Sequence, residues 1–177
     1  MTGLLVESLF LLASTTLALP LQSDTTFRLP GIIAGTPPAV DGVVGESEWR
    51  GAAVASDFIQ FQPHRGEDSD FRTEVLVMYD SAHLYVAFRL WDPEPPAAQL
   101  TRRDANLQSD DAVAVLLDSH LDRQSAYFFM TNALSTQFDG RIANDGRTTD
   151  ATWDAPWEAA ATQTDFGWSA EIAIPFT

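Results

Sequence analysis

The sequence predicts an all-β protein, an antiparallel β-sandwich of the jelly-roll or immunoglobulin-like kind with about eight strands. Short runs rich in Val, Leu, Tyr and Phe recur at close spacing between residues 72 and 176, and turn-forming residues separate them. No stretch shows the period of a convincing amphipathic helix. A chain of 177 residues with ordinary apolar content can build one core, but not comfortably two. We therefore expect a single sandwich domain.

The individual strands are expected to follow one another in hairpins. "RTEVLVMYD" and "LYVAFRLWD" flank the turn-like "DSAH", and "DAVAVLLD" pairs with "AYFFMTN" across the polar turn "SHLDRQ". "TQFDGRIAND" predicts a shorter strand with a turn at Asp139 and Gly140, and "ESEWRGA" predicts one helical turn. The expected strands are residues 72–80, 84–92, 111–118, 126–132, 136–145, 157–164 and 167–176.

The last strand shows the clearest alternation of apolar and polar side chains. In "GWSAEIAIPF" the apolar side chains at positions 168, 170, 172 and 174 alternate with Ser169, Glu171 and Ala173. This two-residue period is typical of a half-buried strand. The pattern places Glu171 on the side away from the apolar stripe, where we expect it to be solvated or paired with an arginine.

The first residues predict export from the cytoplasm. Residues 9–19 form an apolar run that is too short for a membrane helix, which needs about 20 residues, but suits a signal peptide. The first eight residues carry Glu7 and no Arg or Lys, unlike a usual signal peptide. We expect a signal peptide over residues 1–23, a Pro- and Gly-rich linker over 24–38, and the domain over 39–177. The expected location is the periplasm, the outer membrane or the exterior.

Composition excludes several classes of function. The net charge is −15 and all ten basic residues are arginines, so a nucleic acid partner is not expected. The chain has no cysteine, which excludes disulfides, thiol catalysis and Cys-based zinc sites. It also lacks the nucleophile-elbow, His-Glu-x-x-His and phosphate-loop motifs. We expect a non-catalytic chain, although it could be an appendage of a larger carbohydrate-active polypeptide of the glycoside hydrolase type.

Four motifs in order carry a resemblance to a known family. These are "PPAVDGVVGESEWRGAAVASDF", "VLVMYDSAHLYVAFRLWDPEP", "SDDAVAVLLD" and "GWSAEIAIPF". Over residues 37–176 the chain resembles the family 9 carbohydrate-binding modules, and it looks closest to the N-terminal domain of bacterial outer-membrane-associated proteins. The resemblance implies a β-sandwich, export, and binding of a polysaccharide or oligosaccharide. It also implies a C-terminal outer-membrane β-barrel as a partner region, and places Trp49 and Trp168 in the core.

The sugar contacts of the family do not carry over to this sequence. One family ring stands just before the "DDAVAVLLD" strand, where residues 107–109 contain no aromatic residue. The second ring follows the "IPF" strand, so the resemblance leads us to expect a domain truncated at Thr177. A family arginine that contacts sugar falls near Phe129 or Met130, where this chain has none. The resemblance therefore supports the fold more strongly than it supports sugar binding.

Tryptophans in a polar stretch are the main binding candidates. "DGRTTDATWDAPWEAAAT" holds Trp153 and Trp157, an even number of residues apart, so both face one side of an extended chain. Trp157 begins an apolar alternation and is expected in the core. Trp153 could offer a flat ring to a sugar or close an open end of the sandwich. The predicted sugar site comprises Trp153, Trp91, Asn144 and Asp154. The alternative is a structural or interaction domain of an outer-membrane β-barrel protein that has lost the sugar site.

Acidic loop residues are the candidates for a metal site. They lie at strand ends and in loops: Asp104, Asp110, Asp111, Asp118, Asp122, Asp139, Asn144, Asp145, Asp150 and Asp154. Loop carboxylates are the oxygen ligands that Ca²⁺ prefers, and related modules often hold structural calcium. We expect Asp118, Asp122 and Asp145 as ligands of one Ca²⁺, the alternative being a solvated acidic surface. Some sandwiches bind haem through methionine, but core packing explains Met78 and Met130 more simply.

Overall fold

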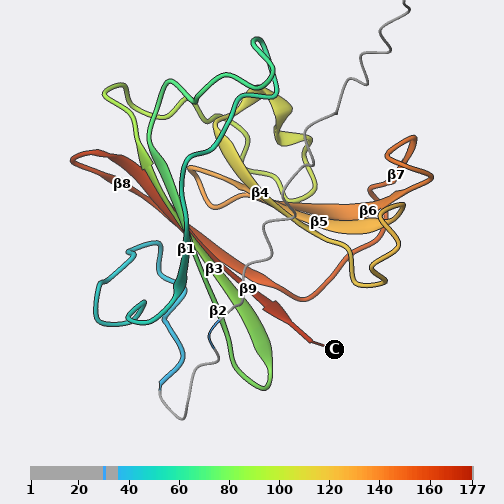
Figure 1. Ribbon diagram of the computed structural model, residues 1–177, viewed down its shortest axis with the longest axis horizontal. Coiled ribbons are helices and arrows are strands. Elements are labelled where there is room, and N and C mark those ends of the chain that lie inside the picture. Colours follow the sequence, from blue (N-terminus) through green and yellow to red (C-terminus); the bar gives the residue numbers. More distant parts are fainter. Residues whose placement is uncertain (1–29, 31–35, 177) are drawn as a thin grey trace, which may run out of the picture.

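A computed structural model describes residue 30 and residues 36–176 of the chain (Figure 1). The predicted signal peptide and most of the predicted linker therefore lie outside the described residues. The described part of the chain forms nine strands in two antiparallel sheets, which confirms the predicted β-sandwich. Apart from the 3₁₀ turn η1 (Leu107–Ser109), the structure assigns no helix to these residues. The described residues therefore contain no helix long and apolar enough to cross a membrane.

The larger sheet has five strands in the order β1-β2-β3-β9-β8, and the smaller has four in the order β4-β5-β6-β7. Their bounds are β1 Ala53–Ala55, β2 Thr73–Tyr79, β3 His83–Trp91, β4 Ala112–Leu117, β5 Ala126–Asn132, β6 Gln137–Ala143, β7 Thr148–Asp150, β8 Glu158–Thr164 and β9 Gly167–Pro175. The last of the described strands, β9, thus lies inside the larger sheet, between β3 and the edge strand β8 (Figure 1).

The inner faces of the two sheets form the main core. Alternate residues of β3 and β9 point inward and meet Val113 and Phe129 of the smaller sheet. Trp157 and Trp168 are buried in this core, as predicted, and the Trp157 ring packs edge-on against Phe129 at 5.4 Å between centroids. The alternation seen in the sequence of the last strand is therefore the pattern of a core strand.

The outer face of β9 is also buried, which the sequence prediction missed. Residues 38–52, here called the strap, cover this face and bring Trp49 into a second apolar cluster with Met78. Glu171 is 1% exposed and accepts hydrogen bonds from Trp49 Nε1 at 2.8 Å and from the backbone N–H groups of Asp41 at 3.0 Å and Gly42 at 2.9 Å. The prediction of a solvated or arginine-paired Glu171 was wrong, because three donors from the strap replace water.

Gly42 explains how the strap can lie so close to the sheet. Its φ is +85°, and a Cβ atom there would lie 2.8 Å from the backbone carbon of Ala161 and from the side chain of Thr162. Residues 46–52, predicted as one helical turn, form hydrogen-bonded turns without an assigned helix: the N–H of Trp49 donates to the carbonyl of Gly45 at 3.2 Å, and that of Ala52 donates to the carbonyl of Trp49 at 3.1 Å. Turn and glycine together place the Trp49 indole above Glu171.

The predicted hairpins are confirmed, with two differences. The short strands β1 and β7 were not predicted, since neither has a distinctive apolar pattern. The turn predicted at Asp139 and Gly140 was wrong, because β6 runs through both residues and the turn follows at 144–147. A glycine is required inside this strand, since a Cβ atom at Gly140 would lie 2.6 Å from the ring of Phe128.

Candidate functional site

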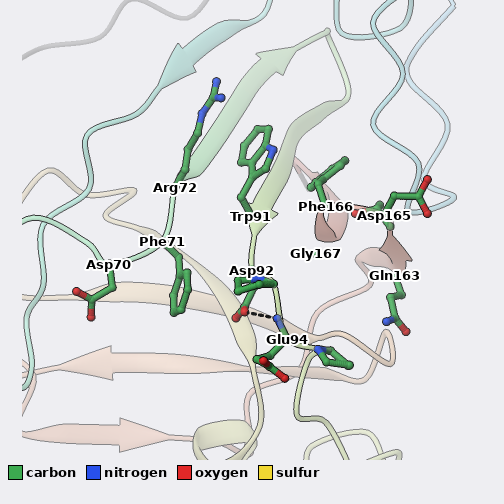
Figure 2. Close-up of a pocket in the computed structure, with 13 residues that line it drawn as sticks. Asp70, Phe71, Arg72, Trp91, Asp92, Glu94, Gln163, Asp165, Phe166 and Gly167 are labelled. Atoms are coloured by element: carbon green, nitrogen blue, oxygen red, sulfur yellow. Dashed lines mark hydrogen bonds between the residues drawn. The ribbon is translucent and has the colours of Figure 1, made fainter.

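The candidate site is a hollow at one end of the larger sheet, here called the Trp91 pocket (Figure 2). It has a volume of about 610 Å³ and is lined by residues 70–72, 91–95 and 163–167. These segments meet because Thr73 pairs with Leu90 and Trp91 pairs with Gly167, so the start of β2, the end of β3 and the β8–β9 turn lie side by side. The pocket is thus a product of the antiparallel register.

The aromatic wall of the pocket is a stack of three side chains. The Trp91 ring stacks on Phe166, with 5.0 Å between centroids and 29° between the ring planes. The Arg72 guanidinium lies over the same indole at 4.3 Å from its centroid, and Figure 2 shows Arg72 and Phe166 on opposite sides of Trp91. This stack holds the indole in place. The ring surface left for a ligand comes mainly from Phe71 and Phe166, which are 49% and 36% exposed.

The polar wall of the pocket is acidic. Asp70, Asp92, Glu94 and Asp165 line it together with the amide of Gln163. Asp92 Oδ1 accepts the backbone N–H of Glu94 at 2.8 Å, which fixes the loop that follows β3 (Figure 2). These carboxylates are hydrogen-bond acceptors only.

Arg72 does not make the pocket cationic. It forms a salt bridge with Glu74, whose other carboxylate oxygen lies 3.6 Å from Arg89 Nη1. The charge of Arg72 is therefore partly balanced on the outer face of the sheet. The pocket presents hydrogen-bond acceptors beside ring surfaces and repels anions.

Trp91 and Trp153 do not share one site. Trp153 packs on the core, with its ring centroid 4.6 Å from that of Tyr127 and 6.0 Å from that of Phe129. It lines a largely apolar groove of about 450 Å³, the Trp153 groove, with residues 174–176 at the far end of β9. Gly167 and Pro175 bound a strand that spans roughly 27 Å at the usual rise per residue. A short ligand cannot bridge the two tryptophans.

The other two predicted sugar contacts lie in neither hollow. Asn144 lies in the turn after β6 with a φ of 56°, and its Nδ2 donates to Thr148 Oγ1 at 3.1 Å. Asp154 accepts a hydrogen bond from Arg103 Nη2 at 2.6 Å. Both side chains are engaged in local structure.

Two of the predicted calcium ligands, Asp118 and Asp122, are engaged in local hydrogen bonds. Asp118 accepts the backbone N–H groups of Asp122 and Arg123 at 3.2 and 2.7 Å. Asp122 accepts those of Gln124 and Ser125, which lowers its pKa below the ordinary value. Asp118 and Asp145 line one shallow hollow of about 330 Å³, but Asp122 does not. These carboxylates organise a turn and do not converge, so a common ion fits them poorly; calcium binding stays a prediction.

A different set of three carboxylates does converge among the described residues. One ligand oxygen each from Asp104, Asp139 and Asp154 lies within 4.8 Å of the others. Arg103 stands among them, 3.8, 3.1 and 2.6 Å from the three carboxylates respectively. Its hydrogen bond with Asp154 raises the pKa of Arg103 above the ordinary value. The Arg103 guanidinium thus supplies the positive charge that the three carboxylates require.

The sequence prediction missed Phe71, Arg72 and Phe166 as pocket residues. Each stands at the edge of a correctly predicted strand, which was the available signal. Deriving the pocket also requires knowing that the last strand pairs with β3, and hairpin reasoning from sequence does not give that pairing.

Comparison with solved structures agrees with the observed fold. The chain is similar to a family 9 carbohydrate-binding module from Caldicellulosiruptor kristjanssonii in complex with cellotriose, with 20% identity and a TM-score of 0.56 over 83% of this chain and 67% of that chain. The corresponding complex with glucose gives 21% identity and a TM-score of 0.50 over 85% and 70%. A protein from Bacteroides uniformis ATCC 8492 gives 10% identity and a TM-score of 0.61 over 84% and 71%. At these identities the likeness shows the fold alone.

A comparison with curated protein sequences finds no match. The family model described as "Carbohydrate family 9 binding domain-like" matches residues 40–177, which is most of the chain and includes both sheets and the strap from Val40 onward. The matched range also contains the strap tryptophan Trp49 and its partner Glu171, which the structure joins directly. The chain therefore belongs to the carbohydrate family 9 binding domain-like family.

Proposed function

We propose that the chain is a non-catalytic carbohydrate-binding module and that it binds neutral glycans in the Trp91 pocket. The observation that carries this proposal is the pairing of ring surface with hydrogen-bond acceptors in one open hollow. Phe71 and Phe166 offer flat apolar faces that suit the C–H face of a sugar. Asp92, Glu94 and Gln163 offer acceptors for sugar hydroxyl groups.

The charge of the pocket narrows the class of glycan. Asp70, Asp92, Glu94 and Asp165 surround it, and the nearest cation, Arg72, is bridged to Glu74. Uronate and sulfate groups would be repelled by these carboxylates. A neutral chain avoids that repulsion and still uses the acceptors.

A binding role suits the pocket better than glycoside hydrolysis. A glycosidase needs a carboxylic acid with a raised pKa in its cleft to protonate the leaving group. Burial raises the pKa of Glu171, but this side chain lies under the strap and not in the Trp91 pocket. The carboxylates that line the pocket stand on open loops.

Export to the periplasm, the outer membrane or the exterior belongs to the same proposal, and so does a partner region that forms an outer-membrane β-barrel. The apolar run at residues 9–19 and the resemblance described above support both. The alternative function is an interaction domain without sugar binding. It is favoured by Leu107, a fully buried leucine at the place where the resemblance puts a sugar-binding ring.

The test is isothermal titration calorimetry, in which the chain is titrated with neutral cello-, xylo-, manno- and chito-oligosaccharides and with anionic alginate. We expect saturable binding of at least one neutral series and no binding of alginate. Phe71→Ala should weaken binding about 3- to 10-fold. The matched control is Phe176→Ala, which removes a ring of comparable exposure, 57% against 49% for Phe71, from the Trp153 groove and should bind like wild type.

The outcomes separate the alternatives. A loss in Phe176→Ala with none in Phe71→Ala would place the site in the Trp153 groove. Folded wild-type protein that binds no glycan would favour the interaction domain.

A further inference from the structure

A row of four aromatic residues runs across the end of the larger sheet that carries the Trp91 pocket. Here called the aromatic row, it consists of Phe58, Phe71, Trp91 and Phe166. Phe58 follows β1, Phe71 precedes β2, Trp91 ends β3 and Phe166 precedes β9. The row therefore takes one ring from the same end of four adjacent strands.

The strand pairings fix the order of the row. Ala55 pairs with Val75, Thr73 with Leu90 and Trp91 with Gly167. Neighbouring strands lie about 4.8 Å apart, so three steps from β1 to β9 cover roughly 15 Å. That length exceeds what one sugar ring needs.

A second hollow continues the Trp91 pocket along this row. It has a volume of about 540 Å³ and is lined by residues 56–58, 68–69 and 71–74. The two hollows share Phe71 and Arg72, so they meet at the middle of the row. Both are open to solvent.

Each hollow repeats the same combination of groups. The second hollow has the ring of Phe58, which is 41% exposed, and acceptors on Asp57, Asp68 and Ser69. The backbone around Phe58 is held in place, since the N–H of Ser69 donates to the carbonyl of Phe58 at 3.1 Å. Ring and acceptors thus occur twice along one open line.

We infer that the two hollows form a single groove that binds an interior stretch of a neutral glycan chain, several sugars long, and not one terminal sugar. This inference rests on the proposed function and specifies its substrate as a chain. The physical reason is that the partly exposed rings of Phe58, Phe71 and Phe166 stand at successive points of the row and can each stack on a different sugar of the same chain. Trp91 supports the row, since Phe166 and Arg72 cover its ring. Because neither hollow is enclosed, the chain can continue beyond both ends of the groove.

The same loop supplies a matched control residue. Phe61 is 71% exposed and lies three residues after Phe58, but it lines neither hollow. The Arg65 guanidinium lies over its ring at 5.2 Å from the centroid. Phe61→Ala therefore removes an exposed ring from the loop without touching the groove.

The experiment titrates wild type, Phe58→Ala and Phe61→Ala with cello-, xylo-, manno- and chito-oligosaccharides of one to six units, including hexasaccharides with chemically reduced ends. In wild type, affinity should rise by about tenfold or more from disaccharide to hexasaccharide, and end reduction should leave it unchanged. Phe58→Ala should lose about 3- to 10-fold for the hexasaccharide and less than about twofold for the disaccharide. Phe61→Ala should match wild type.

The two proposals fail in different ways. Binding that is equally strong for short and long ligands, or that is lost on end reduction, would overturn the extended groove and leave the proposed function standing. Equal effects of Phe58→Ala and Phe61→Ala would also overturn the groove. Failure of every series to bind wild type would overturn the proposed function and the groove with it.

Discussion

The two ends of the larger sheet each carry a partly exposed tryptophan, yet they are built by different forces. At the Trp91 end, an arginine and a phenylalanine flank the indole, and carboxylates fix the loops around it. At the Trp153 end, the indole packs on Tyr127 and Phe129 as part of the core. The comparison teaches that a tryptophan in a polar stretch does not by itself indicate a binding surface. The hydrogen-bond acceptors around the ring also have to be considered.

The largest effect on stability is expected from the hydrogen bonds and ion pairs of Arg103 and Asp139, which support the Trp153 end. Asp139 is fully buried, accepts the N–H of Ala155 at 2.9 Å and pairs with Arg103 at 3.1 Å. Arg103→Ala would leave that buried carboxylate without its cation, so we expect a loss of about 3 kcal/mol in the free energy of unfolding. Denaturant titration measures it.

The matched control for this network is an arginine pair on the surface. Arg147 and Asp145 are both exposed, and their charged atoms lie 3.8 Å apart. Arg147→Ala should cost less than about 0.5 kcal/mol. Equal losses in the two variants would contradict the structural role of Arg103.

The second largest effect on stability is expected from replacing one of the two tryptophans, and its size should differ between them. Trp153→Ala removes ring contacts with the core, and we expect it to cost about 2–3 kcal/mol of unfolding free energy. Trp91→Ala removes a ring that rests on Phe166 and Arg72 at the surface, and should cost about 1 kcal/mol. Thermal and denaturant unfolding of both variants would test this order. A larger loss in Trp91→Ala than in Trp153→Ala would contradict the assignment of Trp153 to the core and of Trp91 to the surface.

The smallest expected effect is a pH dependence of stability that arises from Asp110. The connection that leaves the Trp91 pocket is tied by Asp110, which accepts the N–H groups of Leu100 at 2.9 Å and Gln99 at 3.0 Å. The bond from Leu100, with further bonds from Asn132 and Gln99, holds the pKa of Asp110 below its ordinary value of 3.8. A lowered pKa means that this stabilisation is present above 3.8 and is lost as pH falls through the folded-state value.

Asp110→Asn tests that dependence. At pH 7 the wild type should be more stable than the variant, and the difference should shrink as the pH falls below about 3.8. Urea titrations of both proteins across this range measure it. A difference that grows on acidification would mean that the sign of the Asp110 contribution is wrong.

Much of the fold could be predicted from the sequence because its signals are local. The alternation in residues 167–175 and the turn between β2 and β3 identify strands without any knowledge of the tertiary structure. Trp157 was placed in the core because an apolar alternation begins at that residue.

The rest depends on contacts between distant residues. Glu171 was misjudged because its three donors come from residues about 120–130 positions earlier in the chain. Phe71 and Phe166 lie almost a hundred residues apart, and the pairings of β2 with β3 and of β3 with β9 bring them to the same pocket. Hydrophobic periodicity carries no information about either contact.

The position of β9 between two other strands has a consequence for how the protein is made. A ribosome synthesises this strand after the other eight described strands, yet β3 and β8 both require it as a neighbour. The strap, among the earliest parts of the domain to be made, must also wait for Glu171 before its N–H groups find their acceptor. The nascent chain therefore carries two unpaired strand edges, on β3 and β8, until residues 167–175 leave the exit tunnel. The larger sheet cannot close until β9 has been made, and a chain cut before residue 167 has no means of completing it.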